Sequence, residues 1–581
     1  MRISNDTIGR WAARSRLLRS VLRRAALLAA FVVLAFPAIA GGSKDAAPAG
    51  APDSAQGAAA SGSSAPARLF ATVGDPNYRS PRHAPIDRDS LENQSVGLSP
   101  DWWVDSAFYH VWVKSFSDYD GDGVGDFRGI TAKLDYIKDE VGCDAIWLSP
   151  IFDCGGKGSS PDFNMHGYDT VDYYEVNDYF GNKEQLAELL AAAHKRGMKV
   201  IFDFVPNHTS NAHPWFLQSV GFDPEKKDWY LWNDKKLPWS PMGNANTWYR
   251  SDIRQSYYYG AFWSGMPDLN FNNREVREEM KNVVRYWLDF GFDGLRIDAV
   301  RYLLEEGSGA AGTADTKGTH AFWGELRAEV VDRYAELGVP KFMVGEAWIN
   351  GDRPRLESYF GSRTAGEFNM LFDFDFSGKV AMAVKNRNMA LFQGGFAAGE
   401  GSPPGARLAV FLSNHDNLSD RPGTVYRDAD QLRAASALSL LVPATPFVYY
   451  GNEIGQPDQK GKAGQDIRLR QPFDWSSEAA QSKAPDSLLA LHKDLLTLRA
   501  AHPALRRGTW KRLDLGSASL GSWTAETEGE KIACVFNLGP DTVTGVSDLI
   551  ARSLGVARLV PLYEGGSDEL GRYGFAVYKA R

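Results

Sequence analysis

Charged and polar side chains close four short segments of the sequence that otherwise have the composition of β-strands. The segments end Asp203-Phe-Val-Pro-Asn207-His208, Gly294-Leu-Arg296-Ile-Asp298, Gly345-Glu346-Ala-Trp348 and Asn414-His415-Asp416-Asn417. A charged group that closes an apolar strand costs several kcal/mol unless it is paired. Each of these groups therefore needs a partner or a chemical role.

Three of the carboxylates, Asp298, Glu346 and Asp416, are of the kind that hydrolysis of a glycosidic bond requires. In that reaction one carboxylate is an ionised nucleophile, and another carboxyl is a protonated acid for the leaving oxygen. Arg296 lies two residues before Asp298 on one strand, so both side chains point to the same side and the guanidinium is expected to keep Asp298 ionised. Glu346 has no cation beside it in the sequence, and neighbouring negative charges are expected to raise its pKa. The alternative is that these groups form ion pairs that only stabilise the fold.

The elements that must position these groups alternate between strand and helix patterns, which predicts βα units and a parallel sheet. Leu186, Leu189, Leu190 and Ala193, for example, have the spacing of a helix packed on a sheet. Eight strands with alternating helices fit a closed (β/α)₈ TIM barrel, an α/β fold, whose working residues lie at the C-terminal strand ends. The predicted strands are 108–116, 145–150, 199–207, 292–300, 341–348, 368–376, 408–416 and 447–451.

The domain boundaries follow from changes in composition. Arginines between positions 10 and 24 precede an apolar run and the small-residue stretch Ala38-Ile39-Ala40, which predicts a signal peptide at 1–40, with an uncleaved anchor as the alternative. Residues 41–98 are read as a disordered Ala/Gly/Ser/Pro linker. The barrel is predicted at 99–207 and 272–505, with an inserted subdomain at 208–271 after the third strand. Residues 506–581 are predicted to form a C-terminal antiparallel β domain, a β-sandwich.

Composition excludes several classes of protein. A net charge of −8 in 581 residues argues against nucleic acid as a partner. The cysteines, Cys143, Cys154 and Cys534, are odd in number and show no obvious pair, so an exported chain of this kind does not depend on disulfides. No spacing suggests a zinc site, and no later segment has an apolar stretch long enough to cross a bilayer. A monomer is expected in the periplasm or the medium, without stable membrane insertion once the signal is cleaved.

The four strings resemble the short sequence regions of the α-amylase family of glycoside hydrolases, and Met266-Pro-Asp-Leu-Asn270 resembles a fifth. The resemblance runs from about residue 108 to 475 and implies a role for each matching position. Asp298 matches the nucleophile, Glu346 the general acid/base, and Asp416 the third carboxylate, which binds sugar hydroxyls. Positions matching contacts around the cleaved glucose are His166, Tyr168, His208, Arg296, His415, Asp466 and Arg470, and the matching structural positions are Asp203 and Asn207.

A second constellation, Asp118-Tyr-Asp120-Gly-Asp122-Gly-Val-Gly-Asp126, places alternate aspartates on a glycine-rich loop. These carboxylates and the carbonyl of Val124 could direct several oxygens at one hard cation. An EF-hand is disfavoured because its twelfth position is Gly129 instead of Glu. The resemblance favours a structural Ca²⁺ here, and an ordinary Asp-Gly turn is the alternative. Another calcium site of many α-amylases uses a His after the nucleophile, where this chain has Ala-Val-Arg-Tyr-Leu, so that site is in doubt.

The expected activity is retaining hydrolysis of α-1,4-glucosidic bonds in starch or maltooligosaccharides. An α-glucosidase, a cyclomaltodextrinase or neopullulanase, and a trehalose-forming transglycosylase share the scaffold and stay open as alternatives. A non-catalytic sugar-binding barrel is a remote alternative, because such relatives typically lose a catalytic carboxylate and all three are present here.

Overall fold

The structure, a computed structural model, describes residues 94–95, 97–154, 166–244, 246–392, 402–416, 420–426, 428–461, 466–517, 519–563 and 568–581. The predicted signal peptide and most of the predicted linker lie outside the described residues. In the described part of the chain, no helix combines the length and apolar character needed to span a bilayer.

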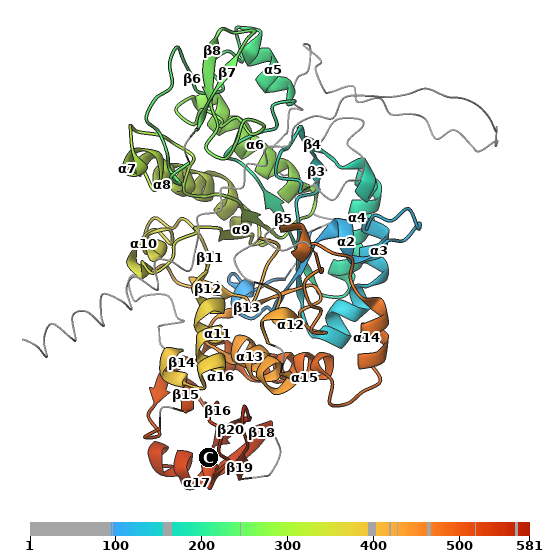
Figure 1. The fold of residues 1–581 in the computed structure, drawn as a ribbon, viewed down its shortest axis with the longest axis vertical. Helices are drawn as coiled ribbons and strands as arrows, with labels where there is room; N and C mark the ends of the chain where they lie inside the picture. Colours follow the sequence, from blue (N-terminus) through green and yellow to red (C-terminus); the bar gives the residue numbers. More distant parts are fainter. Residues whose placement is uncertain are drawn as a thin grey trace, which may run out of the picture. The chain divides into compact units, whose positions relative to one another are not determined.

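Eight parallel strands form a closed barrel, as the sequence predicts (Figure 1). In chain order they are β1 (Phe108–Val111), β2 (Ala145–Leu148), β5 (Lys199–Phe204), β9 (Gly294–Ile297), β10 (Phe342–Gly345), β11 (Met370–Phe372), β12 (Arg407–Val410) and β13 (Thr445–Tyr449). The barrel closes where β1 pairs with both β2 and β13. The strands are buried along almost their whole length, which explains their near-continuous apolar sequences.

Most of the observed strands end several residues earlier than predicted. The first predicted strand, 108–116, is β1 up to Val111 followed by the short helix α2 (Val113–Phe116). Apolar composition continues past the strand ends because the connections there also pack inward, with Val113 and Phe116 buried. Composition alone therefore cannot show at which residue the backbone stops pairing with the neighbouring strands.

Helices surround the barrel. The principal ones are α3 (Phe127–Ala132), η3 (Tyr136–Val141), α4 (Lys183–Lys195), α6 (Arg274–Phe290), α8 (Lys317–Leu326), η5 (Arg327–Val331), α9 (Asp332–Glu336), α11 (Phe376–Asn386), α13 (Ala429–Leu441) and α15 (Leu488–Ala501). Helix α4 shows how the sequence specifies one of them. Asn182 and Gln185 form a capping box at its start, and its predicted apolar stripe is buried.

Two insertions interrupt the alternation. Strands β3 (Phe152–Asp153) and β4 (Asp172–Val176) follow β2. Helix α5 (Pro214–Val220) and a three-stranded antiparallel sheet follow β5, within the segment predicted as a subdomain; the strands are β6 (Trp232–Asn233), β7 (Trp248–Ser251) and β8 (Ser256–Tyr259). The insertion returns to the barrel through isolated bridges from His208 to Asp268 and from Tyr230 to Leu269. It is thereby fixed beside the C-terminal end of β5.

The N-terminal face of the barrel is covered by η2 (Trp102–Val104). Trp102 and Trp103 pack on Phe342, the first residue of β10, and the indole N–H of Trp102 donates to the carbonyl of Pro340. Gln94 is also buried and donates to the carbonyl of Leu288. The predicted linker therefore ends earlier than residue 98, because the Gln94 amide satisfies carbonyls at the end of α6.

The C-terminal domain is an antiparallel five-stranded sheet in the order β14-β15-β16-β20-β18. Its strands are β14 (Thr509–Leu513), β15 (Leu520–Thr527), β16 (Glu530–Asn537), β20 (Phe575–Ala580) and β18 (Leu559–Tyr563). One face joins the apolar cluster of the barrel helices, and the other is covered by α17 (Val546–Leu554) and the ribbon of β17 (Val543–Thr544) and β19 (Glu569–Leu570). The expected second layer of a sandwich is thus mostly helical.

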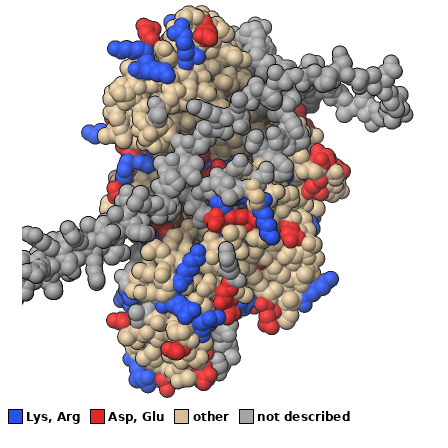
Figure 2. Space-filling model, viewed as in Figure 1, with Lys and Arg blue, Asp and Glu red and all other residues tan. Residues whose placement is uncertain are grey.

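Shorter helices occupy the connections: η4 (Asp178–Phe180), α7 (Ala310–Thr313), α10 (Arg353–Ser358), η6 (Met389–Leu391), α12 (Pro422–Val425), η7 (Asp466–Leu469), α14 (Trp475–Gln481) and α16 (Pro503–Arg507). On the face shown in Figure 2, acidic and basic side chains are interspersed, and no large basic patch is visible among the described residues.

Candidate active site

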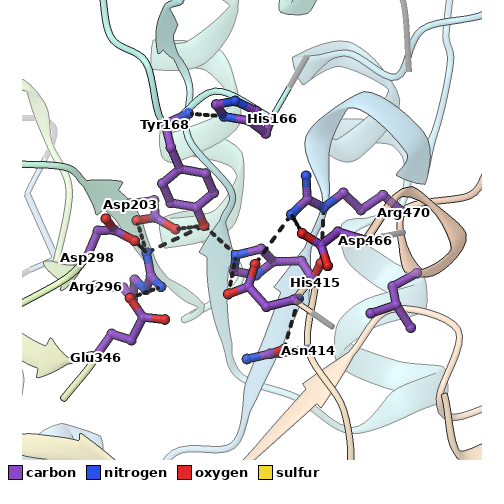
Figure 3. A network of polar contacts seen from close by, with 12 residues as sticks. His166, Tyr168, Asp203, Arg296, Asp298, Glu346, Asn414, His415, Asp466 and Arg470 are labelled. Carbon is purple, nitrogen blue, oxygen red and sulfur yellow. Dashed lines mark hydrogen bonds and ion pairs between the residues drawn. The ribbon is translucent and has the colours of Figure 1, made fainter. Parts of the chain in front are cut away.

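The predicted acidic residues converge because the strands that carry them are neighbours. Strand β9 pairs with β10 and with β5, in a register that aligns Ile297 with Gly345 and Arg296 with Asp203. Asp298 and Glu346 each come directly after an aligned strand end. Their side chains consequently lie beside each other (Figure 3).

Arg296 lies at the centre of this group and is almost completely buried. Its Nη1 is 2.6 Å from Oδ1 of Asp203 and 2.9 Å from Oδ1 of Asp298, and its Nη2 is 3.0 Å from Oε2 of Glu346. The predicted pairing of Arg296 with Asp298 is present. Glu346 has no cation beside it in the sequence, but the same guanidinium also reaches it across from β9 to β10.

The pKa values of the two carboxyls are shifted by several causes. Burial raises the pKa of Asp298 to about 6, against the lowering effect of Arg296. Burial raises the pKa of Glu346 to about 7, again opposed by Arg296 and reinforced by the charge of Asp298. The closeness of the two carboxyls lowers the pKa of Asp298 and raises that of Glu346. Of the two carboxyls Glu346 thus has the higher pKa, although Arg296 does not overcome the burial of Asp298.

Ala299 is a member of this site that the sequence did not reveal. Its φ of 50° lies in the left-handed region, which costs of order 1 kcal/mol or more for a residue other than glycine. In this conformation its backbone N–H donates to Oε2 of Glu346 over 3.1 Å. The strained turn after Asp298 therefore anchors Glu346, and only a structure could show it, because Ala carries no signal of its own.

A second group surrounds Asp416, at the end of the segment after β12. Oδ2 of Asp416 is 3.3 Å from Nε2 of His415, and its Oδ1 is 3.3 Å from Nη2 of Arg470. The Arg470 guanidinium stacks over Trp112, with 4.7 Å from Cζ to the ring centroid, and lies 3.7 Å from Asp466. Burial raises the pKa of Asp416 to about 7, reinforced by Glu346 and opposed by Arg470.

Tyr168 joins the two groups. Its hydroxyl lies 2.6 Å from Nε2 of His415 and donates to Oδ2 of Asp203 over 3.1 Å. Its ring lies nearly parallel to that of His415, with centroids 5.4 Å apart. Tyr168 thus lies between the Arg296 group and the Asp416 group.

The remaining predicted residues lie at different distances from this centre. His208 is buried, and its Nε2 lies 3.1 Å from the carbonyl oxygen of Tyr168. His166 instead lies on the far side of Tyr168, where its Nδ1 accepts the backbone N–H of Tyr168 over 3.0 Å (Figure 3). That is the contact of a capping histidine, and the structure gives His166 no contact with the three carboxylates.

The glycine-rich loop gathers ligand oxygens of Asp118, Asp120 and Asp126 within 4.8 Å of one another. Asp122 is outside this group, and its Oδ1 accepts the N–H of the buried Val124 over 2.7 Å. In the described part of the chain, none of these aspartates forms an ion pair with Lys or Arg.

Two glycines hold this loop against α2 and the residue after it. A Cβ atom at Gly125 would lie 2.2 Å from the carbonyl oxygen of Val113, and one at Gly129 would lie 2.0 Å from that of Ser117. An all-oxygen set of like charge fits a hard cation.

A further set of buried oxygens lies where the insertion meets the barrel. Among the described residues, no hydrogen-bond donor reaches Oδ1 of Asn207, Oδ2 of Asp268, either carboxylate oxygen of Glu305, or the hydroxyl of Tyr259. The charges of Asp268 and Glu305 interact, and burial raises the pKa of both carboxyls. Buried carboxylate oxygens without donors also fit a hard cation. Sequence reasoning named Asn207 but missed Asp268 and Glu305 as possible ligands, because they come from separate segments.

The chain is similar to known proteins over most of its length. The family model described as "Alpha amylase, catalytic domain" matches residues 110–508. Alpha-amylase 3 of Dictyoglomus thermophilum is 32% identical over 474 residues, which cover 76% of this chain and 86% of that protein. A trehalose synthase/amylase of Mycolicibacterium smegmatis is 31% identical over 533 residues, covering 78% of this chain and 87% of that protein. The crystal structure of an α-amylase from H. orenii, 28% identical, has a TM-score of 0.65 and covers 82% of this chain and 99% of that one.

Proposed function

Because the chain belongs to the α-amylase family of glycoside hydrolases, we propose that it hydrolyses α-1,4-glucosidic bonds of starch, maltodextrins or related α-glucans with retention of configuration. The observation that carries this proposal is the pair Asp298 and Glu346, joined by one guanidinium at the ends of adjacent strands. In a retaining enzyme the two carboxyls are close, with no water between them.

Each carboxyl has its own role in the proposed reaction. Asp298 attacks the anomeric carbon while Glu346 gives its proton to the leaving glycosidic oxygen, and a covalent glycosyl ester forms. Glu346 then removes a proton from water, whose oxygen attacks the same carbon and releases Asp298. Asp416, held by Arg470 and His415, binds sugar hydroxyls and supports distortion of the ring.

The proposed cofactor is Ca²⁺ in a structural role. Asp118, Asp120 and Asp126 would hold one ion, and Asn207, Asp268 and Glu305 would hold another. When bound, the ions would neutralise gathered carboxylates and tie loops to the barrel, without taking part in proton transfer.

A trehalose-forming transglycosylase is the second candidate, since the trehalose synthase/amylase is nearly as similar as the α-amylase and matches as much of the chain. It would use the same ester but let a sugar hydroxyl, in place of water, attack it. A non-catalytic sugar-binding barrel is disfavoured because Asp298, Glu346 and Asp416 are all present and gathered.

A product time course separates these activities. The purified protein should release maltooligosaccharides from soluble starch and maltotriose, and NMR of the fresh product should show the α-anomer first. Conversion of maltose to trehalose without net hydrolysis would favour the transglycosylase. Absence of turnover on starch, maltotriose, maltose, trehalose, pullulan and sucrose would favour a binding protein, and initial β-anomer would exclude retention.

We further propose that the chain is exported and acts as a monomer in the periplasm or the medium, after cleavage following residue 40. N-terminal sequencing of the protein from the periplasm and the medium would test the cleavage, and light scattering would test the oligomeric state. An intact N-terminus or a stable dimer would contradict these two expectations.

A further inference from the structure

The segment after Asp298 is tied to the segment after Glu346 by a contact that no step of the proposed reaction uses. Arg301 lies three residues after Asp298, and its Nη1 donates to the carbonyl oxygen of Trp348 over 2.7 Å. Trp348 lies two residues after Glu346. The tie therefore spans the two turns that carry the proposed nucleophile and the proposed acid.

The guanidinium of Arg301 is itself held rigidly. Its Nε and Nη2 donate to both oxygens of Asp315, over 2.8 and 2.7 Å, in a two-pronged ion pair whose side chains are 13% and 11% exposed. The hydroxyl of Tyr359 donates to Asp315 over 2.6 Å, and Arg355 contacts the same carboxylate. Two-pronged pairs of this kind fix orientation as well as adding energy. Because Nε and Nη2 are both bound to Asp315, the orientation of Nη1 is set as well, and it points toward the carbonyl oxygen of Trp348.

The other end of the tie is also fixed. The Trp348 indole lies parallel to the ring of Phe374, with centroids 5.4 Å apart and an angle of 6° between the planes.

The backbone of Asp315 is in the left-handed region, with φ of 53°, and its N–H donates to the carbonyl of Arg301 over 2.9 Å. Strain retained in a non-glycine residue indicates that its surroundings determine the conformation.

We propose that Arg301 is a positioning residue, which holds the turn carrying Glu346 against the turn carrying Asp298 and so fixes the acid relative to the nucleophile. Together with the bond from the Ala299 N–H to Glu346, it makes two ties between these turns. The proposal rests on the proposed function. It explains why an arginine fork is needed: a lysine offers its donors from one atom and cannot span Asp315 and Trp348 in the same geometry.

The proposal can be tested with two substrates that differ in how much they need protonation by Glu346. Cleavage of maltotriose requires protonation of the leaving oxygen, whereas an α-glucosyl fluoride requires little. Arg301→Gln should lower kcat on maltotriose by about 10²-fold, the loss typical of a misplaced catalytic group, with KM little changed. Its kcat on the fluoride should stay near that of the wild type. Arg301→Lys, which keeps the charge, should show the same dependence on the leaving group.

Arg355→Gln is the matched control, since Arg355 contacts the same Asp315 carboxylate but not Trp348. It should leave both rates near those of the wild type. An equal loss on both substrates in Arg301→Gln, or no loss, would overturn the positioning role while leaving the proposed function intact. If the wild-type protein turns over neither substrate, the proposed function itself fails. Should Arg301→Gln not fold, the ratio of the two rates in Arg301→Lys decides.

Discussion

Nη2 of Arg296 lies 3.0 Å from Oε2 of Glu346, so the proposed acid and the proposed nucleophile share one cation. A shared cation lowers both pKa values, and it cannot by itself assign the proton. The closeness of the two carboxyls separates their pKa values, because it lowers the pKa of Asp298 and raises that of Glu346.

The roles of the carboxyls can be separated by the leaving group. Glu346→Gln should lose about 10²–10⁴-fold on maltotriose and recover most of its glycosylation rate on an α-glucosyl fluoride. Asp298→Asn should show no recovery, because the covalent step is lost. Asp416→Asn should lose rate on both substrates, since its role is to hold the ring. Recovery in Asp298→Asn instead of Glu346→Gln would show that the two roles are reversed.

The plot of kcat/KM against pH should be a narrow bell-shaped curve. Asp298 must be ionised, so kcat/KM should fall as the pH drops through about 6, where its carboxylate takes up a proton. Glu346 must be protonated, so the rate should fall again as the pH rises through about 7. Initial rates on maltotriose from pH 4 to pH 9 would measure both limbs. A plateau extending unchanged to pH 9 would contradict the assignment of Glu346 as the acid.

Replacement of Arg296 should affect stability and the acid limb together. Arg296→Met leaves Asp203, Asp298 and Glu346 buried without their common cation, and breaking such a buried pair costs about 3–5 kcal/mol. The lowering effect on the pKa of Asp298 also disappears, so the acid limb should move to higher pH. Urea unfolding and the pH profile of residual activity measure the two effects. An unmoved acid limb would mean that Arg296 does not control that carboxyl.

Removal of calcium should lower the melting temperature, because an ion that binds only the folded state stabilises it by mass action. Asp120→Asn should lose part of the response to EDTA, since Asp120 belongs to the gathered oxygens. Asp122→Asn is the matched control from the same loop and should retain the response. Glu305→Gln should remove a separate part of the response to EDTA, the part due to the ion proposed at Asn207, Asp268 and Glu305. An EDTA-independent melting curve in the wild type would exclude both ions.

The sequence predicted contacts within one strand better than contacts between strands. The spacing of Arg296 and Asp298 was enough to predict their pairing, since alternate residues of a strand share a face. The contact of Arg296 with Glu346 depends on the register of β9 and β10, which no local pattern contains. Asp268 and Glu305 were missed because they come from separate segments, and Ala299 because an alanine carries no signal of its own. Barrel topology, in contrast, followed from alternating patterns along the chain.

Strand ends and short strands were the weaker predictions. Apolar residues beyond β1 and β9 pack inward without pairing, so composition overestimated both strands. The role of His166 as a sugar contact stays a prediction from its place in the motif; its Nδ1 accepts the backbone N–H of Tyr168.

The pairing of β1 with β13 has a consequence for synthesis on the ribosome. Phe108 aligns with Phe447, so the first barrel strand to emerge keeps an unpaired edge until nearly the whole barrel has been made. An exposed edge of this kind readily pairs with other chains, and pairing across such a sequence separation is slow. Nascent chains should therefore need a chaperone that shields β1, and premature termination between β12 and β13 should yield aggregates in place of a smaller folded domain.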